Sequence, residues 1–262
     1  MRNMDNDVCR VLAGAVFAPL VLFLTTAPAA RATTIAVPNF SFESPMLQPG
    51  ANNNGGNGDT TAIPGWTITA PSSSGINNGI YHPIGGFTTT NPLPPPADAN
   101  QIAYLFPGNT GATSSITTTS SVSSIAANTT YMLTVALGNR NDNLFFDTGL
   151  YTIDLLANGV SVAENTLAGS AVPRGSFVDL STSFLSNPTL MGESLTIRLS
   201  ATAGTPNDEG IFDNVRLTAT TTGPVSVPDP ANTAVLLGFA AVALAVVRAR
   251  TGGAQGSPSF LN

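Results

Sequence analysis

The stretch that decides the fold is Leu150-Tyr-Thr-Ile-Asp-Leu-Leu-Ala-Asn-Gly-Val-Ser-Val-Ala-Glu-Asn-Thr-Leu167. Its first half carries apolar residues two apart, at Tyr151, Ile153 and Leu155, which share one face of an extended strand. Asn158-Gly159 follows at once, and this dipeptide is a strong signal for a tight turn between antiparallel strands. The stretch therefore predicts a β-hairpin with one buried face.

The same signals recur along most of the chain. Turn residues (Gly, Asn and Pro) separate short runs rich in β-branched and aromatic residues, and no amphipathic helix pattern occurs between Thr33 and Gly223. The expected strands are Thr34–Val37 with Phe40–Glu43, Trp66–Thr69, Gln101–Phe106, Ser114–Ile125, Thr130–Leu137, Leu150–Ala157, Val160–Leu167, Ser176–Phe184, Ser194–Ala201 and Ile211–Ala219. We therefore expect an all-β domain, with a sandwich as the default architecture.

The N-terminal segment has a different composition. Arg2 and Arg10 precede an uncharged apolar run, and the segment ends on the small residues of Ala30-Arg-Ala32. This layout is typical of a secretory signal peptide, which we expect to form an apolar helix and to be removed after residue 32. A membrane anchor is the alternative, but Pro28 would break a continuing helix.

The C-terminal segment contains a second apolar run. Residues 231–247 carry no charge and span roughly 25 Å as a helix, which is short for a bilayer core of about 30 Å. A buried core helix is the alternative, but apolar residues cover every face of this run. We expect a single hydrophobic transmembrane helix, with its C-terminal end held in the cytoplasm by the arginines that follow.

Residues around this run resemble a known sorting signal. Pro228, Asp229 and Pro230 precede the hydrophobic run, and Arg248 and Arg250 follow it. The order resembles the PEP-CTERM tail of Gram-negative bacteria, although Asp replaces the usual Glu and twelve residues extend beyond the arginines. The resemblance implies transient insertion in the inner membrane, an exosortase-type protease as partner, and a final location at the cell surface or in the exopolysaccharide matrix.

These observations predict five segments. They are a signal peptide at 1–32, a β domain at 33–219, a linker at 220–227, a sorting signal at 228–250 and a disordered tail at 251–262.

The part expected to be exported is strongly acidic. The chain has no lysine, and residues 33–223 hold four arginines against twelve carboxylates, a net charge near −8. Such a surface disfavours DNA or RNA as a partner and suits calcium or neutral glycans. The one cysteine, Cys9, lies in the signal segment, so the exported domain has no disulfide and no thiol nucleophile.

A second resemblance covers most of the β domain. Its motifs are Asn39-Phe-Ser-Phe-Glu43-Ser-Pro, Ile63-Pro-Gly-Trp66, Thr130-Tyr-Met-Leu-Thr134 and Ile211-Phe-Asp-Asn-Val215-Arg-Leu. In this order they resemble galactose-binding-like jelly rolls, which include many carbohydrate-binding modules. The resemblance implies a jelly-roll sandwich and a structural calcium ion held by Glu43 and Asp213.

The residue pattern around Asp213 favours the same site independently. Asp213 is in phase with Ile211, Val215 and Leu217, so it should face inward. A buried carboxylate is costly unless it is paired or bound to a metal. The alternative is an aspartate that accepts hydrogen bonds from the backbone of the neighbouring strand.

Three residues are candidates for ligand binding. Tyr81 and Tyr104 offer aromatic planes, and His82 offers a polar group beside Tyr81. We expect Trp66, at the start of a strand, to lie mainly in the core. The long loops at 48–61 and 91–98 either shape a binding edge or form surface decoration.

Residues suited to catalysis are few. The domain has one histidine, no lysine and no cysteine, and it lacks a Gly-x-Ser-x-Gly elbow. We therefore predict a protein that is not an enzyme but an exported glycan-binding or structural surface protein. The alternative is a secreted carbohydrate-active enzyme that uses paired carboxylates among Asp142, Asp208 and Glu209. We expect Arg140 and Asp142 to form an ion pair in a loop.

Overall fold

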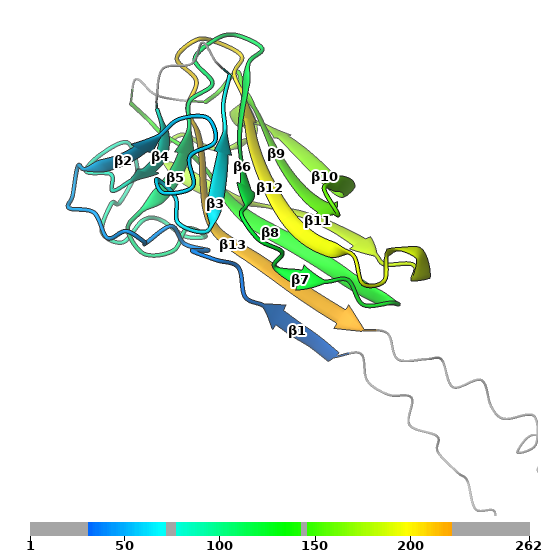
Figure 1. The fold of residues 1–262 in the computed structure, drawn as a ribbon. Coiled ribbons are helices and arrows are strands. Elements are labelled where there is room, and N and C mark those ends of the chain that lie inside the picture. Colours follow the sequence, from blue (N-terminus) through cyan, green and yellow to red (C-terminus); the bar gives the residue numbers. More distant parts are fainter. Residues whose placement is uncertain (1–30, 72–76, 143–145, 222–262) are drawn as a thin grey trace, which may run out of the picture. The chain divides into compact units, whose positions relative to one another are not determined.

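The computed structural model describes residues 31–71, 77–142 and 146–221. These residues form two β-sheets packed face to face (Figure 1), with antiparallel pairing between all hydrogen-bonded strands described. The expected all-β sandwich of antiparallel sheets is therefore confirmed.

The first sheet has seven strands in the order β11-β8-β13-β5-β4-β2, with β1 paired to β13. Its members are β1 (Arg31–Ile35), β2 (Asn52–Gly55), β4 (Asn78–Tyr81), β5 (Ile102–Leu105), β8 (Thr129–Asn139), β11 (Ser176–Leu185) and β13 (Gly210–Thr221).

The second sheet has six strands in the order β10-β9-β12-β6-β3, with β7 paired to β12. Its members are β3 (Trp66–Thr69), β6 (Thr113–Thr118), β7 (Ser123–Ser124), β9 (Leu150–Ala157), β10 (Val160–Ala168) and β12 (Ser194–Thr202). Two short 3-10 turns lie between strands of different sheets: η1 (Gly169–Ala171) between β10 and β11, and η2 (Pro188–Leu190) between β11 and β12.

The hairpin formed by β9 and β10 confirms the turn predicted at Asn158-Gly159. Both turn residues adopt positive φ, 48° at Asn158 and 81° at Gly159. Two successive left-handed residues match the right-handed twist of the strands that they join. Ala157 and Val160 are consequently the first pair of the register.

The main core lies between the two sheets. Trp66 is fully buried there, as expected, and its indole nitrogen donates a 2.9 Å hydrogen bond to the Pro38 carbonyl. Tyr151 packs against Phe146 and Phe212, with ring centroids 4.5 and 5.3 Å apart. Aromatic side chains that fill the space between sheets dominate the burial that stabilises such a domain.

A β-bulge in β13 corrects the expected phase of this strand. The register against β8 shifts between Asp213 and Arg216, and Asn214 adopts a φ of 45°. Because the bulge inserts a residue, Val215 and Leu217 face the inter-sheet core while Ile211 packs on the outer face of the sheet. The prediction that all of these share one face was wrong.

The segment before Gln101 differs most from the prediction. Residues 40–43 lie in and directly after a turn at 38–41 and do not form a strand, because Asn39 and Phe42 adopt positive φ. Strands β2 and β4 were not predicted, since Asn and Gly dominate them and have weak strand propensity. They pair closely: a Cβ atom at Gly79 would lie 1.9 Å from the Asn53 carbonyl oxygen.

Residues 1–30 of the expected signal segment and the hydrophobic helix expected at 231–247 lie outside the residues that the structure describes, whereas Arg31 and Ala32 begin strand β1. Within residues 31–71, 77–142 and 146–221, no helix is long and apolar enough to cross a membrane.

Candidate functional site

A second apolar cluster lies on the outer face of the seven-stranded sheet. Its buried members are Phe87, Leu93, Ile102, Tyr104, Ala136, Phe177 and Ile211. Alternation along β5 separates the two clusters, since Ala103 and Leu105 face the inter-sheet core. The segment between β4 and β5 contributes Phe87 and Leu93, and it therefore covers this outer face.

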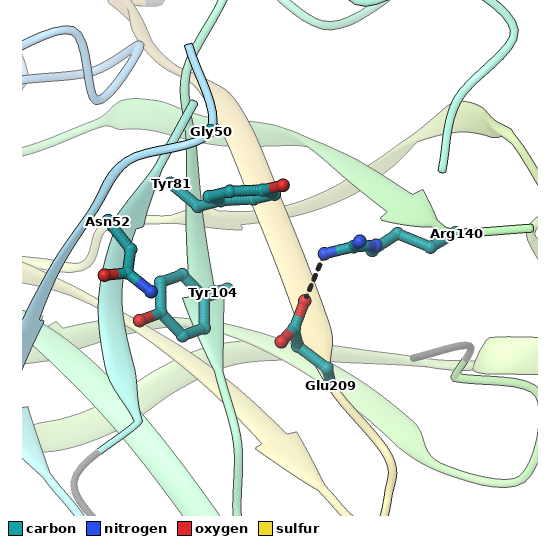
Figure 2. A pocket seen from close by; sticks show the side chains of 6 residues that line it. All are labelled: Gly50, Asn52, Tyr81, Tyr104, Arg140 and Glu209. Carbon is teal, nitrogen blue, oxygen red and sulfur yellow. Dashed lines mark hydrogen bonds and ion pairs between the residues drawn. The ribbon is translucent and has the colours of Figure 1, made fainter. Parts of the chain in front are cut away.

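A cavity of about 310 Å³ opens beside this outer cluster. Five neighbouring strands of one sheet, or the residues that flank them, supply its walls (Figure 2), which are Gly50, Asn52, Tyr81, Tyr104, Arg140 and Glu209. The tyrosines come from β4 and β5, Arg140 directly follows β8, and Glu209 directly precedes β13. The cavity thus belongs to the outer face of the sheet and not to the space between the sheets.

Two tyrosines form the aromatic wall of the cavity. The rings of Tyr81 and Tyr104 meet edge to face, with centroids 6.5 Å apart. The Tyr104 hydroxyl donates a hydrogen bond to the Asn54 side-chain oxygen. Burial, and secondarily the charge of Glu209, raises the pKa of Tyr104, so its hydroxyl remains protonated.

Glu209 is the buried acid of the cavity. Its residue is only 6% exposed, and burial raises the pKa of its carboxyl from 4.5 to about 7. Arg140 opposes this rise through its charge and a hydrogen bond, whereas Asp142 adds to it. A carboxyl with a pKa near 7 exchanges protons readily at neutral pH, which is what general acid–base catalysis needs.

Arg140 lies between two carboxylates. Its Nη1 atom is 3.3 Å from Glu209 Oε1, an ion pair drawn as a dashed line in Figure 2. Its Nε atom donates to both Asp142 oxygens at 3.1 Å, and the guanidinium carbon is 5.3 Å from the centre of the Tyr81 ring. The expected pair with Asp142 is confirmed, but sequence reasoning missed the contact with Glu209.

The structure brings together two of the three residues predicted to bind a ligand. Tyr81 and Tyr104 share the cavity, whereas His82 does not line it. The His82 Nδ1 atom instead donates a 2.9 Å hydrogen bond to the Leu47 carbonyl, and its backbone bonds to Gly50 and Ala51. His82 therefore fixes the segment that leads into β2.

The carboxylates considered for catalysis do not form a facing pair. Asp208 is fully buried and accepts hydrogen bonds from the hydroxyls of Thr148 and Thr205 and from backbone amides. Asp142 is engaged with Arg140, which leaves Glu209 as the acid of the cavity. In the sequence, the signal for this acid was the adjacent pair Asp208-Glu209 before a strand. The pair alone does not indicate which of the two side chains faces a cavity.

Backbone amides of one short segment donate hydrogen bonds to both residues that were predicted to bind calcium. Glu43 Oε1 accepts hydrogen bonds from the backbone amides of Asn100 and Gln101, at 2.8 and 2.6 Å. Asp213 Oδ2 accepts one from the amide of Asp98, at 2.7 Å. Burial raises the pKa of the Asp213 carboxyl well above its usual range, and the charges of Asp98 and Glu43 add to this.

The segment that contacts Glu43 and Asp213 also contains an unsatisfied hydrogen-bond acceptor. The side-chain oxygen of Asn100 is buried and has no hydrogen-bond partner. Among the described residues, no group of three or more His, Cys, Asp or Glu side chains is placed to hold a metal ion. A cation here would therefore depend on Glu43 and Asp213 together with amide and carbonyl oxygens, a donor set suited to calcium.

The sequence matches the family model described as HpiC1-like, HpiC1 cyclase, over residues 33–218. This match covers most of the chain, so the protein belongs to the HpiC1-like cyclase family. No curated protein matches the sequence.

Solved structures of cyclases share the fold. The Stig cyclase Fisc from Fischerella sp. TAU, in complex with (3Z)-3-(1-methyl-2-pyrrolidinylidene)-3H-indole, is 23% identical with a TM-score of 0.58, and the match covers 74% of this chain and 100% of that one. A cyclase from Fischerella sp. TAU in complex with 4-(1H-indol-3-yl)butan-2-one is 25% identical with a TM-score of 0.56, covering 73% and 99%.

Membership of a cyclase family overturns several predictions from the sequence. The protein is not identified as a PEP-CTERM surface protein, and neither a non-catalytic glycan-binding role nor a carbohydrate-active enzyme is supported. The two resemblances cover different parts of the chain. The sorting-tail resemblance rested on a short compositional pattern at 228–250, outside the described residues. The family match, in contrast, spans the folded domain. The motifs in the β domain correctly indicated a β-sandwich, but a fold does not establish a function.

Proposed function

We propose that this protein is a cyclase in which Glu209 acts as general acid for ring closure of an indole-type small molecule. The observation that carries the proposal is a buried carboxyl with a pKa of about 7 in a cavity walled by two tyrosines. Family membership supports ring closure as the reaction, and the indole compounds bound to the related cyclases support the substrate class.

The reaction needs a proton, an aromatic ring and an unsaturated side chain. Glu209 donates its proton to one carbon of a side-chain alkene, whose π electrons form the new C–H bond and leave the other carbon cationic. The π electrons of the indole ring then form the new C–C bond to that carbon. Loss of a ring proton to the Glu209 carboxylate restores both the aromatic ring and the acid, so the product is an isomer of the substrate.

The cavity walls suit the charged intermediate of this sequence. Aromatic rings attract a cation through their π faces, and Tyr81 already contacts the Arg140 guanidinium in this way. The protonated Tyr104 hydroxyl adds a polar group for orientation.

Deuterium incorporation tests the proposal directly. The protein is incubated in D₂O with a panel of indoles that carry alkenyl side chains at C3. Ring closure by the proposed route gives an isomer that carries one deuterium at carbon, detected by mass spectrometry and NMR. We expect Glu209→Gln to lower the rate by about 10²–10⁴-fold, the usual contribution of a general acid.

The matched control is Glu164→Gln, which makes the same chemical change at an exposed position on β10. It should leave the rate unchanged. Ring closure at full rate by folded Glu209→Gln would reject the proposed acid, and no conversion of any alkenyl indole by the wild-type protein would reject the proposed substrate class.

The oxygen set around Glu43 and Asp213 supports calcium as a structural cofactor. The buried Asp213 carboxylate and the unpaired Asn100 oxygen would both gain a partner from a bound cation. The ion would neutralise the buried Asp213 carboxylate and tie the segment at 98–101 to β13. Calcium, but not magnesium, should raise the melting temperature by roughly 3 °C for each kcal/mol of binding energy, and Asp213→Asn should abolish the rise.

The finer description of the fold is that of a jelly roll. The orders β11-β8-β13-β5 and β10-β9-β12-β6 support it, because most connections from β5 to β13 pass from one sheet to the other. Export through the segment at 1–32 is likewise a proposal. It predicts that the N-terminus of the protein secreted by its host begins at Thr33.

A further inference from the structure

Arg140 divides one positive charge between two carboxylates unequally. Asp142 accepts from Nε with both oxygens at 3.1 Å and also contacts Nη2, whereas Glu209 accepts only from Nη1, at 3.3 Å. The guanidinium donates in a fixed fork, so the donors used by Asp142 are not available to Glu209. Glu209, which lines the cavity, therefore has the longer contact with Arg140.

Three neighbours hold the guanidinium in this position. The Tyr81 ring lies on one side, and the backbone of Gly86 lies against the pair with Asp142. A Cβ atom at Gly86 would be 2.8 Å from Arg140 Nε and 2.9 Å from Asp142 Oδ2, and Gly86 has a φ of +86°. Asn141 fixes the approach, because its amide donates a 2.9 Å hydrogen bond to the Gly86 carbonyl.

We propose that Arg140 and Asp142 form a positioning pair, in which Asp142 retains most of the guanidinium's donors so that Arg140 orients the Glu209 carboxyl without holding it permanently ionised. This inference rests on the proposed role of Glu209 as the acid. It assigns to Asp142, which does not line the cavity, an influence on the reaction through Arg140.

The direction of each effect follows from the charges around Glu209. A carboxylate paired closely with arginine has a pKa lowered by about 1–3 units, which would leave Glu209 deprotonated at neutral pH. Burial dominates instead, with Arg140 lowering and Asp142 raising the pKa of Glu209.

Two tyrosines and one further carboxylate also lie near Glu209. Tyr104 and Tyr151 both have raised pKa values and stay neutral, and Asp208 directs its carboxylate to Thr148 and Thr205. The charges that modify the effect of burial on the pKa of Glu209 are therefore those of Arg140 and Asp142.

The test is an NMR titration of the four glutamates of the chain, labelled with ¹³C at the side-chain carboxyl. Glu209→Gln identifies the Glu209 signal. Asp142→Asn should lower the pKa of Glu209 by about one unit, because it removes a negative charge and frees donors of Arg140 for Glu209. Arg140→Gln should raise it by a similar amount. The alkaline limb of the rate profile for ring closure should move in the same directions.

Asp179→Asn is the control, because it makes the same chemical change in an exposed ion pair, with Arg216, on the same sheet. It should leave the Glu209 signal unchanged. If Arg140→Gln fails to fold, Arg140→Lys takes its place. It keeps the charge but cannot bridge both carboxylates, so it should also change the pKa of Glu209.

Two shifts of the same sign, or none in folded variants, would overturn the inference. The titration needs no substrate, so opposite shifts in a protein without cyclase activity would reject the proposed function and leave the electrostatic pairing intact.

Discussion

Two apolar clusters lie on opposite faces of the same seven-stranded sheet, and they differ in the polar groups that they enclose. In the inter-sheet core, the Tyr151 hydroxyl donates to the Gly138 carbonyl and accepts from the Ile211 amide, so this hydroxyl makes its hydrogen bonds within the protein. On the outer face, Glu209 is buried with one long contact to Arg140. The comparison teaches that one face is built for stability, whereas the other tolerates a buried acid that costs stability.

Truncation of the inter-sheet core should have the largest effect on folding. Trp66→Ala removes a fully buried ring and its hydrogen bond to Pro38, and we expect a loss of about 4 kcal/mol in the free energy of unfolding. Urea denaturation followed by circular dichroism measures it. Because the cavity lies on the other face of the sheet, the proposed binding of indole compounds should be unchanged in the folded fraction. A loss below about 1 kcal/mol would show that this face is not the main source of stability.

The buried acid of the outer face should make stability depend on pH. The pKa of Glu209 rises from 4.5 to about 7 on folding, so the folded state retains a proton that the unfolded chain has already released between these values. The free energy of unfolding should therefore fall as pH rises through this window, by roughly 3 kcal/mol at most.

Glu209→Gln removes this dependence, so the difference between the two proteins isolates one carboxyl. Denaturation midpoints at pH 5 and pH 8 give the comparison. Parallel curves for wild type and Glu209→Gln would mean that the pKa of Glu209 is ordinary in the folded protein.

Changes in the aromatic wall should affect binding more than folding. Tyr81→Ala removes one face of the cavity, and we expect about tenfold weaker binding of 4-(1H-indol-3-yl)butan-2-one, measured by calorimetry. Tyr81→Phe should bind as the wild type does. Phe184→Ala, which removes a ring stacked on Tyr131 outside the cavity lining, serves as control; a loss of affinity there equal to that of Tyr81→Ala would argue against the cavity as the binding site.

Two glycines with positive φ provide the smallest and most selective comparison. Gly159→Ala and Gly86→Ala should each cost about 1 kcal/mol from backbone strain, because both residues have φ above 80°. A Cβ atom at Gly159 meets open space, whereas one at Gly86 meets the Arg140–Asp142 pair. Only Gly86→Ala should therefore shift the titration of Glu209, and an equal shift from Gly159→Ala would contradict the local nature of the pairing.

The inter-sheet core was predictable from the sequence because its signal is local. Alternation at Tyr151, Ile153 and Leu155 and the dipeptide Asn158-Gly159 specify strand and turn without reference to distant residues. Strands β2 and β4 were missed because their Asn and Gly residues are held by pairing partners and not by propensity.

The site was only partly predictable. Tyr81 and Tyr104 were identified by their aromatic planes, but Glu209 and Arg140 lie 69 residues apart and meet only because β13 pairs with β8. Periodicity also misplaced Ile211, because a bulge at Asn214 changes the face of the strand partway along it. Function was misjudged because the motifs of the β domain describe a scaffold. The acid to which we assign the chemistry, Glu209, is distinguished by its burial, which composition does not reveal.

The most direct test of this account is the ¹³C titration of the Glu209 carboxyl in the wild-type protein. We predict an inflection near pH 7 that moves when 4-(1H-indol-3-yl)butan-2-one fills the cavity. An inflection near 4.5 that is indifferent to this compound would contradict the assignment of Glu209 as the acid of a cyclase site.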